Sequence, residues 1–150
     1  MFNALPSAQL LSLADSFGLP LFVYDAATID RQIDTLKSSF DVPSLEIRYA
    51  CKALSTIGVL KQIYKHGCGI DTVSPGEMIM ALEAGVPASH ISFTPSGVLT
   101  EEYAFAIEKG VHVHVDQLHV LEWMERQFPG TAITLRFNPG IQAGGHSKLQ

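Results

Sequence analysis

Residues 45–73 read LEIRYACKALSTIGVLKQIYKHGCGIDTV, and this stretch decides the fold. It begins with a short apolar run at 45–51 and ends with another at 68–73. Between them, residues 57–66 carry apolar side chains at helical spacing, and Gly67 follows as a helix stop. A strand, a helix and a second strand in this order predict a parallel β/α unit, because parallel strands require a crossover that is usually helical.

The same alternation extends on both sides of this unit. Further strands are expected at 21–24, 90–94, 111–115 and 131–137. Further helices are expected at 26–40, from Pro75 to the stop at Gly85, at 100–109 with Thr100 as N-cap, and from the N-cap Asp116 to Phe128. Proline is tolerated in the first turn of a helix, and Thr and Asp are common N-caps.

A polar or charged residue lies at or just past the end of five successive expected strands. These residues are Lys52, Asp71, Thr94, Asp116 and Arg136. Any one of them is explained by the end of a strand alone, but the five recur once in each β/α unit. In a (β/α)8 barrel these ends converge on one face, whereas an open doubly wound sheet spreads them along a line. The pattern favours an α/β fold of the TIM-barrel type.

Composition excludes several functional classes. Of 150 residues, 47% are hydrophobic and 17% are charged, which is typical of a folded globular chain and not of a disordered one. The net charge is −5 with no basic run, so a nucleic-acid partner is not expected. No apolar stretch is long enough for a membrane span, and the first residues lack the positive charge of a secretory signal. The two cysteines lie in apolar runs, which indicates reduced, buried thiols and a cytoplasmic location.

Four sequence blocks together resemble the fold-type III pyridoxal-phosphate decarboxylase family. They are LFVYD (21–25), YACKA (49–53), GIDTVSPGE (69–77) and RFNPG (136–140), and they occur in the order found in that family. The tail AGGHSK (143–148) is also similar to the loop that follows the arginine strand in these decarboxylases.

The resemblance implies an alanine-racemase-like (β/α)8 barrel joined to a C-terminal β-domain. Residues 1–25 then correspond to a lead-in segment with a strand that adjoins the β-domain, and residues 26–150 to the first part of the barrel, with about five of its eight strands. The phosphate- and substrate-binding residues are expected beyond Gln150. Residues 1–150 alone are therefore not expected to form a competent enzyme. An inner barrel face rich in Ile, Val and Phe is expected to lack the strands that close it.

Lys52 is the expected catalytic residue. The resemblance implies that it forms the covalent Schiff-base link to the cofactor, pyridoxal 5'-phosphate. Lysines at 37, 61, 65 and 109 lie on expected helices and fit solvated surface positions, whereas Lys52 continues directly from an apolar strand. Burial in the barrel mouth is expected to disfavour its charged form.

Asp71 and Arg136 are the other expected cofactor-binding residues. The resemblance implies that Asp71 lies near the lysine and the cofactor, where it balances positive charge; a helix-capping or turn role is the alternative. The matching arginine of the family reaches the cofactor, and the apolar neighbours of Arg136 require that its guanidinium find acceptors or water. Whether Arg136 faces into the barrel or outward stays open.

Histidines do not complete a metal site in the sequence. His112 and His114 are two residues apart and share one strand face, but no Cys or carboxylate pattern accompanies them. His146 follows the last strand near the expected substrate entrance. We expect no metal.

The resemblance implies decarboxylation of an amino acid. Within the family, RFNPG and AGGHSK are most similar to the decarboxylases that act on meso-diaminopimelate, which implies lysine and CO2 as products. Related decarboxylases of ornithine, arginine or carboxynorspermidine, an amino-acid racemase, and a non-catalytic homologue that binds the cofactor or a partner protein are the alternatives. The resemblance also implies a cytoplasmic homodimer with shared active sites and a small amino-acid substrate.

Overall fold

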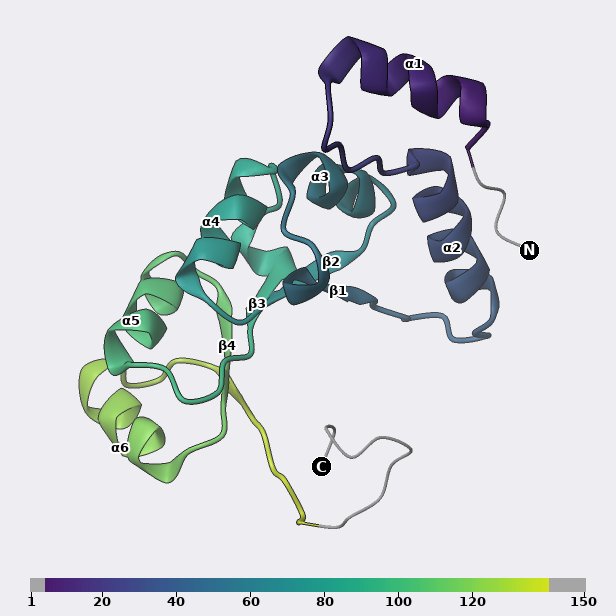
Figure 1. Cartoon of the computed structure of the whole chain (residues 1–150). Coiled ribbons are helices and arrows are strands. Elements are labelled where there is room, and N and C mark those ends of the chain that lie inside the picture. The colour runs from purple at the N-terminus through teal and green to yellow at the C-terminus, as the bar shows by residue number, and fades with distance from the viewer. Residues whose placement is uncertain (1–4, 141–150) are drawn as a thin grey trace.

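The computed structural model describes residues 5–140, and Figure 1 shows strands and helices in alternation. The strands are β1 (Arg48–Ala50), β2 (Gly69–Thr72), β3 (Ile91–Phe93), β4 (His112–Val115) and β5 (Ile133–Leu135). The α-helices are α1 (Ser7–Phe17), α2 (Ala26–Ser38), α3 (Ile57–Lys65), α4 (Pro75–Glu83), α5 (Thr100–Glu108) and α6 (Leu118–Gln127). Two short 3-10 helices, η1 (Cys51–Ala53) and η2 (Ala88–His90), complete the described elements.

The five strands form one parallel sheet in the order β1-β2-β3-β4-β5. Helices α3 to α6 follow one another along one side of this sheet (Figure 1). A doubly wound sheet reverses its strand order and carries helices on both faces, whereas a barrel keeps chain order with helices outside. The expected barrel topology is therefore confirmed, with five strands in the described residues.

The hydrophobic core lies between the sheet and helices α3 to α6. Alternate strand residues are fully buried there: Ile70, Ile91, Phe93 and Val113 are each 0% exposed. Burying a side chain of this kind stabilises the fold by about 1.5–3 kcal/mol. These burials hold the helices against the sheet.

The opposite, concave face of the sheet is polar, so the expectation of an apolar inner face is wrong. Asp71, Ser92 and His112 lie there, one strand position away from the core residues. The helices are the only large apolar partners of the sheet in the described residues, so the Ile, Val and Phe side chains face them. Strand alternation then leaves the polar side chains on the other face.

Helix α4 begins and ends where the sequence predicts. Ser74 Oγ accepts a hydrogen bond from the backbone N–H of Glu77 at 3.3 Å, and the Glu77 carboxylate accepts one from the N–H of Val73 at 2.8 Å. The first of these bonds satisfies an N–H group that the helix leaves free, and Pro75 in the first turn has no N–H that needs a partner. Gly85 ends the segment with φ +83°, which only glycine adopts easily.

The two predicted N-caps, Thr100 and Asp116, are wrong. Helix α5 has Leu99 as its N-cap, and the carboxylate of Glu102 accepts from the N–H of Leu99 at 2.9 Å. Helix α6 has Gln117 as its N-cap. Asp116 directly follows β4, and its Oδ2 accepts a hydrogen bond from Ser96 Oγ at 3.3 Å instead. The Asp116 carboxylate therefore binds the loop that follows β3 and does not cap α6.

The N-terminal segment departs from the sequence pattern in two ways. Helix α1, which the sequence analysis did not predict, contains no buried residue. Residues 21–24, for which the pattern predicts a strand, pair with no strand among residues 5–140. A strand needs a hydrogen-bonded neighbour, and local apolar spacing does not supply one.

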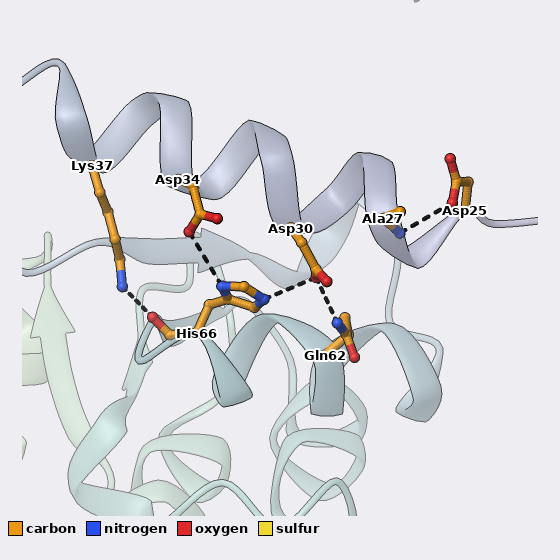
Figure 2. A network of polar contacts seen from close by, with 7 residues as sticks. All are labelled: Asp25, Ala27, Asp30, Asp34, Lys37, Gln62 and His66. Carbon is orange, nitrogen blue, oxygen red and sulfur yellow. Dashed lines mark hydrogen bonds and ion pairs between the residues drawn. The ribbon is translucent and has the colours of Figure 1, made fainter. Parts of the chain in front are cut away.

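Helix α2 is attached to α3 by a polar network (Figure 2). His66 Nε2 lies 2.9 Å from Asp30 Oδ1, which also accepts from Gln62 Nε2 at 2.5 Å. The Lys37 ammonium donates to the backbone carbonyl of His66 just past the end of α3. Ile33 of α2 packs against the core beside these contacts, so polar and apolar contacts together fix the helix.

Among residues 5–140 no helix has both the length and the apolar character needed to cross a bilayer. The AGGHSK segment, with His146, lies outside the described residues.

Candidate active site

Polar side chains gather at the carboxyl ends of the strands and on the concave face. Their positions follow from strand alternation, which turns every second residue away from the helices. The residues are Arg48, Lys52, Asp71, Ser92, Thr94, His112, His114, Thr134 and Arg136. Because the carboxyl ends of parallel strands form one edge of the sheet, residues from all five strands meet there.

Lys52 lies in η1, directly after β1, and its side chain is exposed. The expected burial of Lys52 is therefore not found in the described residues. The strand ends at Ala50 and the chain turns into η1, where Cys51 is the residue that enters the core. Ala50 pairs in register with Asp71, which places the lysine two residues beyond the strand partner of this carboxylate.

Asp71 is held by two hydroxyl groups. Its Oδ1 accepts hydrogen bonds from Ser92 Oγ at 2.7 Å and from Thr94 Oγ1 at 2.5 Å. Asp71 lies inside β2 and caps no helix, so the alternative role as a helix cap is wrong. Ser92 is not among the residues predicted at the site from the sequence, although a serine between the core residues Ile91 and Phe93 indicates a polar inner face.

Arg136 directly follows β5, and its backbone N–H donates to the carbonyl of Val115 at 2.8 Å. Thr134, two residues earlier, contacts His112 on the concave face, with 2.8 Å between Thr134 Oγ1 and His112 Nε2. Strand alternation assigns Arg136 to the same side, and its side chain is exposed. No ion pair within residues 5–140 joins Arg136, Lys52 and Asp71 to one another.

Two neighbouring histidines and an arginine complete the concave face. The His112 and His114 rings lie edge to face, with centroids 5.4 Å apart. Burial lowers the pKa of His114; His112 and Arg48 lower it further, whereas Asp71 raises it. Arg48 Nη2 pairs with Glu46 at 2.5 Å, and its buried Nη1 has no hydrogen-bond partner among residues 5–140. No group of three or more metal-ligating side chains occurs in that range.

A match to a protein-family model shows to which family the chain belongs. The family model for the pyridoxal binding domain of pyridoxal-dependent decarboxylases matches residues 26–150. The chain belongs to this family. The match covers the whole described sheet and begins at the first residue of α2.

Individual members of the decarboxylase family show the same relationship. The diaminopimelate decarboxylase of Methanothermobacter thermautotrophicus is 36% identical over 142 residues, covering 93% of this chain and 33% of that protein. The Streptomyces coelicolor diaminopimelate decarboxylase is 37% identical over 150 residues, covering 97% and 33%. The crystal structure of the Helicobacter pylori diaminopimelate decarboxylase complexed with L-lysine has 28% identity and a TM-score of 0.81, covering 93% of this chain and 36% of that one.

The chain spans about a third of the length of these curated decarboxylases.

The residues at its strand ends fit a pyridoxal compound on chemical grounds. Lys52 offers an exposed primary amine, the group that condenses with an aldehyde. Asp71 offers a carboxylate with one oxygen already fixed, and Arg136 an exposed guanidinium, the group that binds oxyanions.

Proposed function

We propose that this chain provides the pyridoxal phosphate-binding barrel domain of a decarboxylase that converts meso-diaminopimelate into lysine and CO2. The single observation that carries the proposal is Lys52: within the pyridoxal binding domain, this exposed amine lies at the carboxyl edge of the sheet, beyond the strand partner of Asp71. The active sites of TIM barrels are built at this edge.

Each of the three site residues has a proposed role. Lys52 would hold the cofactor through its side-chain amine and would give up this position to the amine of the substrate. Asp71 balances positive charge at that nitrogen, and Arg136 contacts the cofactor from β5. When bound, pyridoxal phosphate supplies an electron sink, so the α-carboxylate can leave as CO2 and a proton can take its place.

The choice of substrate is supported by the curated relatives. Those described above are named diaminopimelate decarboxylases and align over most of this chain. The Helicobacter pylori structure contains L-lysine, the product of the proposed reaction. Decarboxylases of ornithine, arginine or carboxynorspermidine, a racemase and a non-catalytic homologue are the competing outcomes of the assay below.

The assembly is also proposed. Residues 1–25 form the lead-in to a β-domain, residues 26–150 form the first part of the barrel, and two subunits pair to share active sites. Exposed large apolar side chains on the N-terminal segment, such as Phe17 (74%) and Phe22 (84%), support a covering partner for it. A cytoplasmic location is supported by Cys51 and Cys68, which are both buried and free.

Two measurements on the holoenzyme test the proposed function; by holoenzyme we mean the proposed decarboxylase that contains this domain, with its cofactor. Borohydride reduction followed by peptide mapping is expected to place the pyridoxyl group on Lys52. CO2 release is then assayed in parallel with meso-diaminopimelate, ornithine, arginine and carboxynorspermidine. Preference for meso-diaminopimelate supports the proposal, and preference for another amino acid corrects the substrate. A labelled protein that releases no CO2 points to a racemase or a non-catalytic homologue.

A further inference from the structure

Two hydroxyl groups, one in β3 and one directly after it, donate to a single carboxylate oxygen. Ser92 lies in β3 and Thr94 directly follows it, so strand alternation turns both side chains to the concave face. Both donate to Asp71 Oδ1, at 2.7 Å and 2.5 Å. No hydrogen bond to Asp71 Oδ2 is found among residues 5–140. The carboxylate is thus fixed through one oxygen, and the other is left for a further partner.

Joining β2 to β3 does not require these two bonds. The strands already pair in register from Ile70 to Thr72. On the opposite face Thr72 Oγ1 donates to the Ser92 carbonyl at 2.8 Å, and the N–H of Thr94 donates to the Thr72 carbonyl at 2.8 Å. If position 71 only joined the two strands, an apolar residue would serve there without the cost of placing a charge on the sheet.

Asp71, with its Oδ2 atom, lies near the edge of the sheet at which Lys52 is found. Asp71 is the register partner of Ala50, and Lys52 follows two residues later. Hydrogen bonds between a hydroxyl and a carboxylate are charge-assisted, and two of them on one oxygen restrict the rotation of the side chain. The direction of Oδ2 is therefore set by β3, which contains neither the lysine nor the acid.

We propose that Ser92 and Thr94 are positioning residues. They hold the Asp71 carboxylate toward the side-chain nitrogen of Lys52, through which the cofactor is bound. The inference rests on the proposed function, because it gives Asp71 its role at the cofactor. Ser92 and Thr94 act through Asp71 and do not touch the reacting atoms.

The test compares Thr94→Val and Ser92→Ala with Thr94→Ser, which keeps the hydroxyl, and with Thr72→Val. The last variant removes a hydroxyl bond between the same two strands, but on the helix-facing side. For each holoenzyme we measure the dissociation constant of pyridoxal phosphate, the pH midpoint of the absorbance change of the bound cofactor, and thermal unfolding.

Thr94→Val is expected to weaken cofactor binding by about tenfold, because a hydrogen bond to a charged group is worth that factor or more. It is also expected to shift the pH midpoint, and Ser92→Ala to do the same. Thr94→Ser is expected to restore both values, and Thr72→Val to leave both at the wild-type level. A purely structural role would lower the unfolding temperature without moving the pH midpoint.

The outcomes separate this inference from the proposed function. If borohydride labels Lys52 in the wild type but Thr94→Val and Ser92→Ala titrate like the wild type, the positioning role is overturned and the proposed function stands. If Thr72→Val shifts the midpoint as much as Thr94→Val does, the effect belongs to the strand pair and the positioning role again falls. If the wild type is not labelled at Lys52, the proposed function fails and takes this inference with it.

Discussion

His66 Nε2 lies 2.9 Å from Asp30 Oδ1, and this contact joins α3 to α2 (Figure 2). The second ring nitrogen, Nδ1, lies 3.4 Å from Asp34 Oδ1. Each His66 ring nitrogen thus faces a carboxylate one helical turn from the other. Helix α2 contains no fully buried residue, so these polar contacts, together with Ile29 and Ile33 packed against the core, attach it to α3.

Removing the His66 ring is expected to loosen α2 without unfolding the sheet. His66→Ala should lower the free energy of unfolding by about 1 kcal/mol, the typical net contribution of an intramolecular hydrogen bond. Hydrogen exchange should show faster exchange in α2 than in β2 or β3. Asp34→Asn is the weaker control, because its contact is longer and Asp34 is 67% exposed. Equal effects of both variants would contradict a dominant His66–Asp30 contact.

Replacing Lys52 is expected to abolish the covalent cofactor link. Lys52→Ala in the holoenzyme should lose borohydride-trapped pyridoxyl label and turnover, because no other lysine among residues 5–140 lies at the carboxyl end of β1. Lys61→Ala is the matched control, since Lys61 is exposed on α3. Mass spectrometry checks the label. A pyridoxyl group on another lysine of the wild type would refute the assignment.

Arg136→Met tests the last strand. The substitution keeps the aliphatic length and removes the guanidinium, so cofactor affinity should fall and the absorbance of the cofactor should titrate at a different pH. Cooperative unfolding should be retained, because the Arg136 side chain is exposed. Arg126→Met, on the exposed surface of α6, should match the wild type. Unchanged affinity and titration in Arg136→Met would show that Arg136 takes no part in cofactor binding.

The Cys51 thiol is expected to be unreactive in the native protein. Burial raises the pKa of Cys51, and with the added effect of the Glu77 and Asp71 carboxylates it moves from the ordinary value of 9.0 to about 11. As the pH rises, the Cys51 thiol loses its proton in the unfolded chain before it does so in the folded protein. The contribution of this thiol to the free energy of unfolding is therefore fully present below pH 9. It falls as the pH rises toward about 11.

A thiol reagent checks this prediction. At pH 8 Cys51 and Cys68 of the native holoenzyme should react slowly, and denaturant should make both thiols reactive, as mapping of the labelled peptides shows. Cys51→Ala should lose the part of the pH dependence of stability that lies between pH 9 and 11. Rapid labelling of the native wild type at Cys51 would contradict its burial at 1% exposure.

Residues 1–150 expressed alone are expected to aggregate or to remain partly molten. The sheet has two edge strands, β1 and β5, in the described residues, and large apolar side chains such as Leu19 (78%), Leu118 (78%) and Phe137 (85%) are exposed. Dye binding, near-ultraviolet circular dichroism and sedimentation measure this. A soluble monomer that unfolds cooperatively and forms a reducible cofactor link at Lys52 would refute the prediction.

The parts of the site that the sequence predicts are those encoded locally. Lys52 and Arg136 follow β1 and β5, and Asp71 lies one residue before the end of β2, because apolar alternation and helix stops mark where each β/α unit begins and ends. The polar partners of Asp71 are not marked in this way. Ser92 and Thr94 lie about 20 residues away in the chain, and only the pairing of β2 with β3 brings them to the carboxylate.

The sequence by itself determined the alternation of strands and helices, the Ser74–Pro75 start of α4, and the lysine that follows the first barrel strand. Only the tertiary structure decided that the concave face is polar, that Asp116 contacts Ser96 instead of capping α6, and that 21–24 lacks a strand partner among residues 5–140. The physical reason is the distance along the chain over which each kind of interaction acts. Periodicity and capping depend on neighbours within one helical turn, whereas the direction and partners of a side chain depend on which strand the packed core brings alongside it.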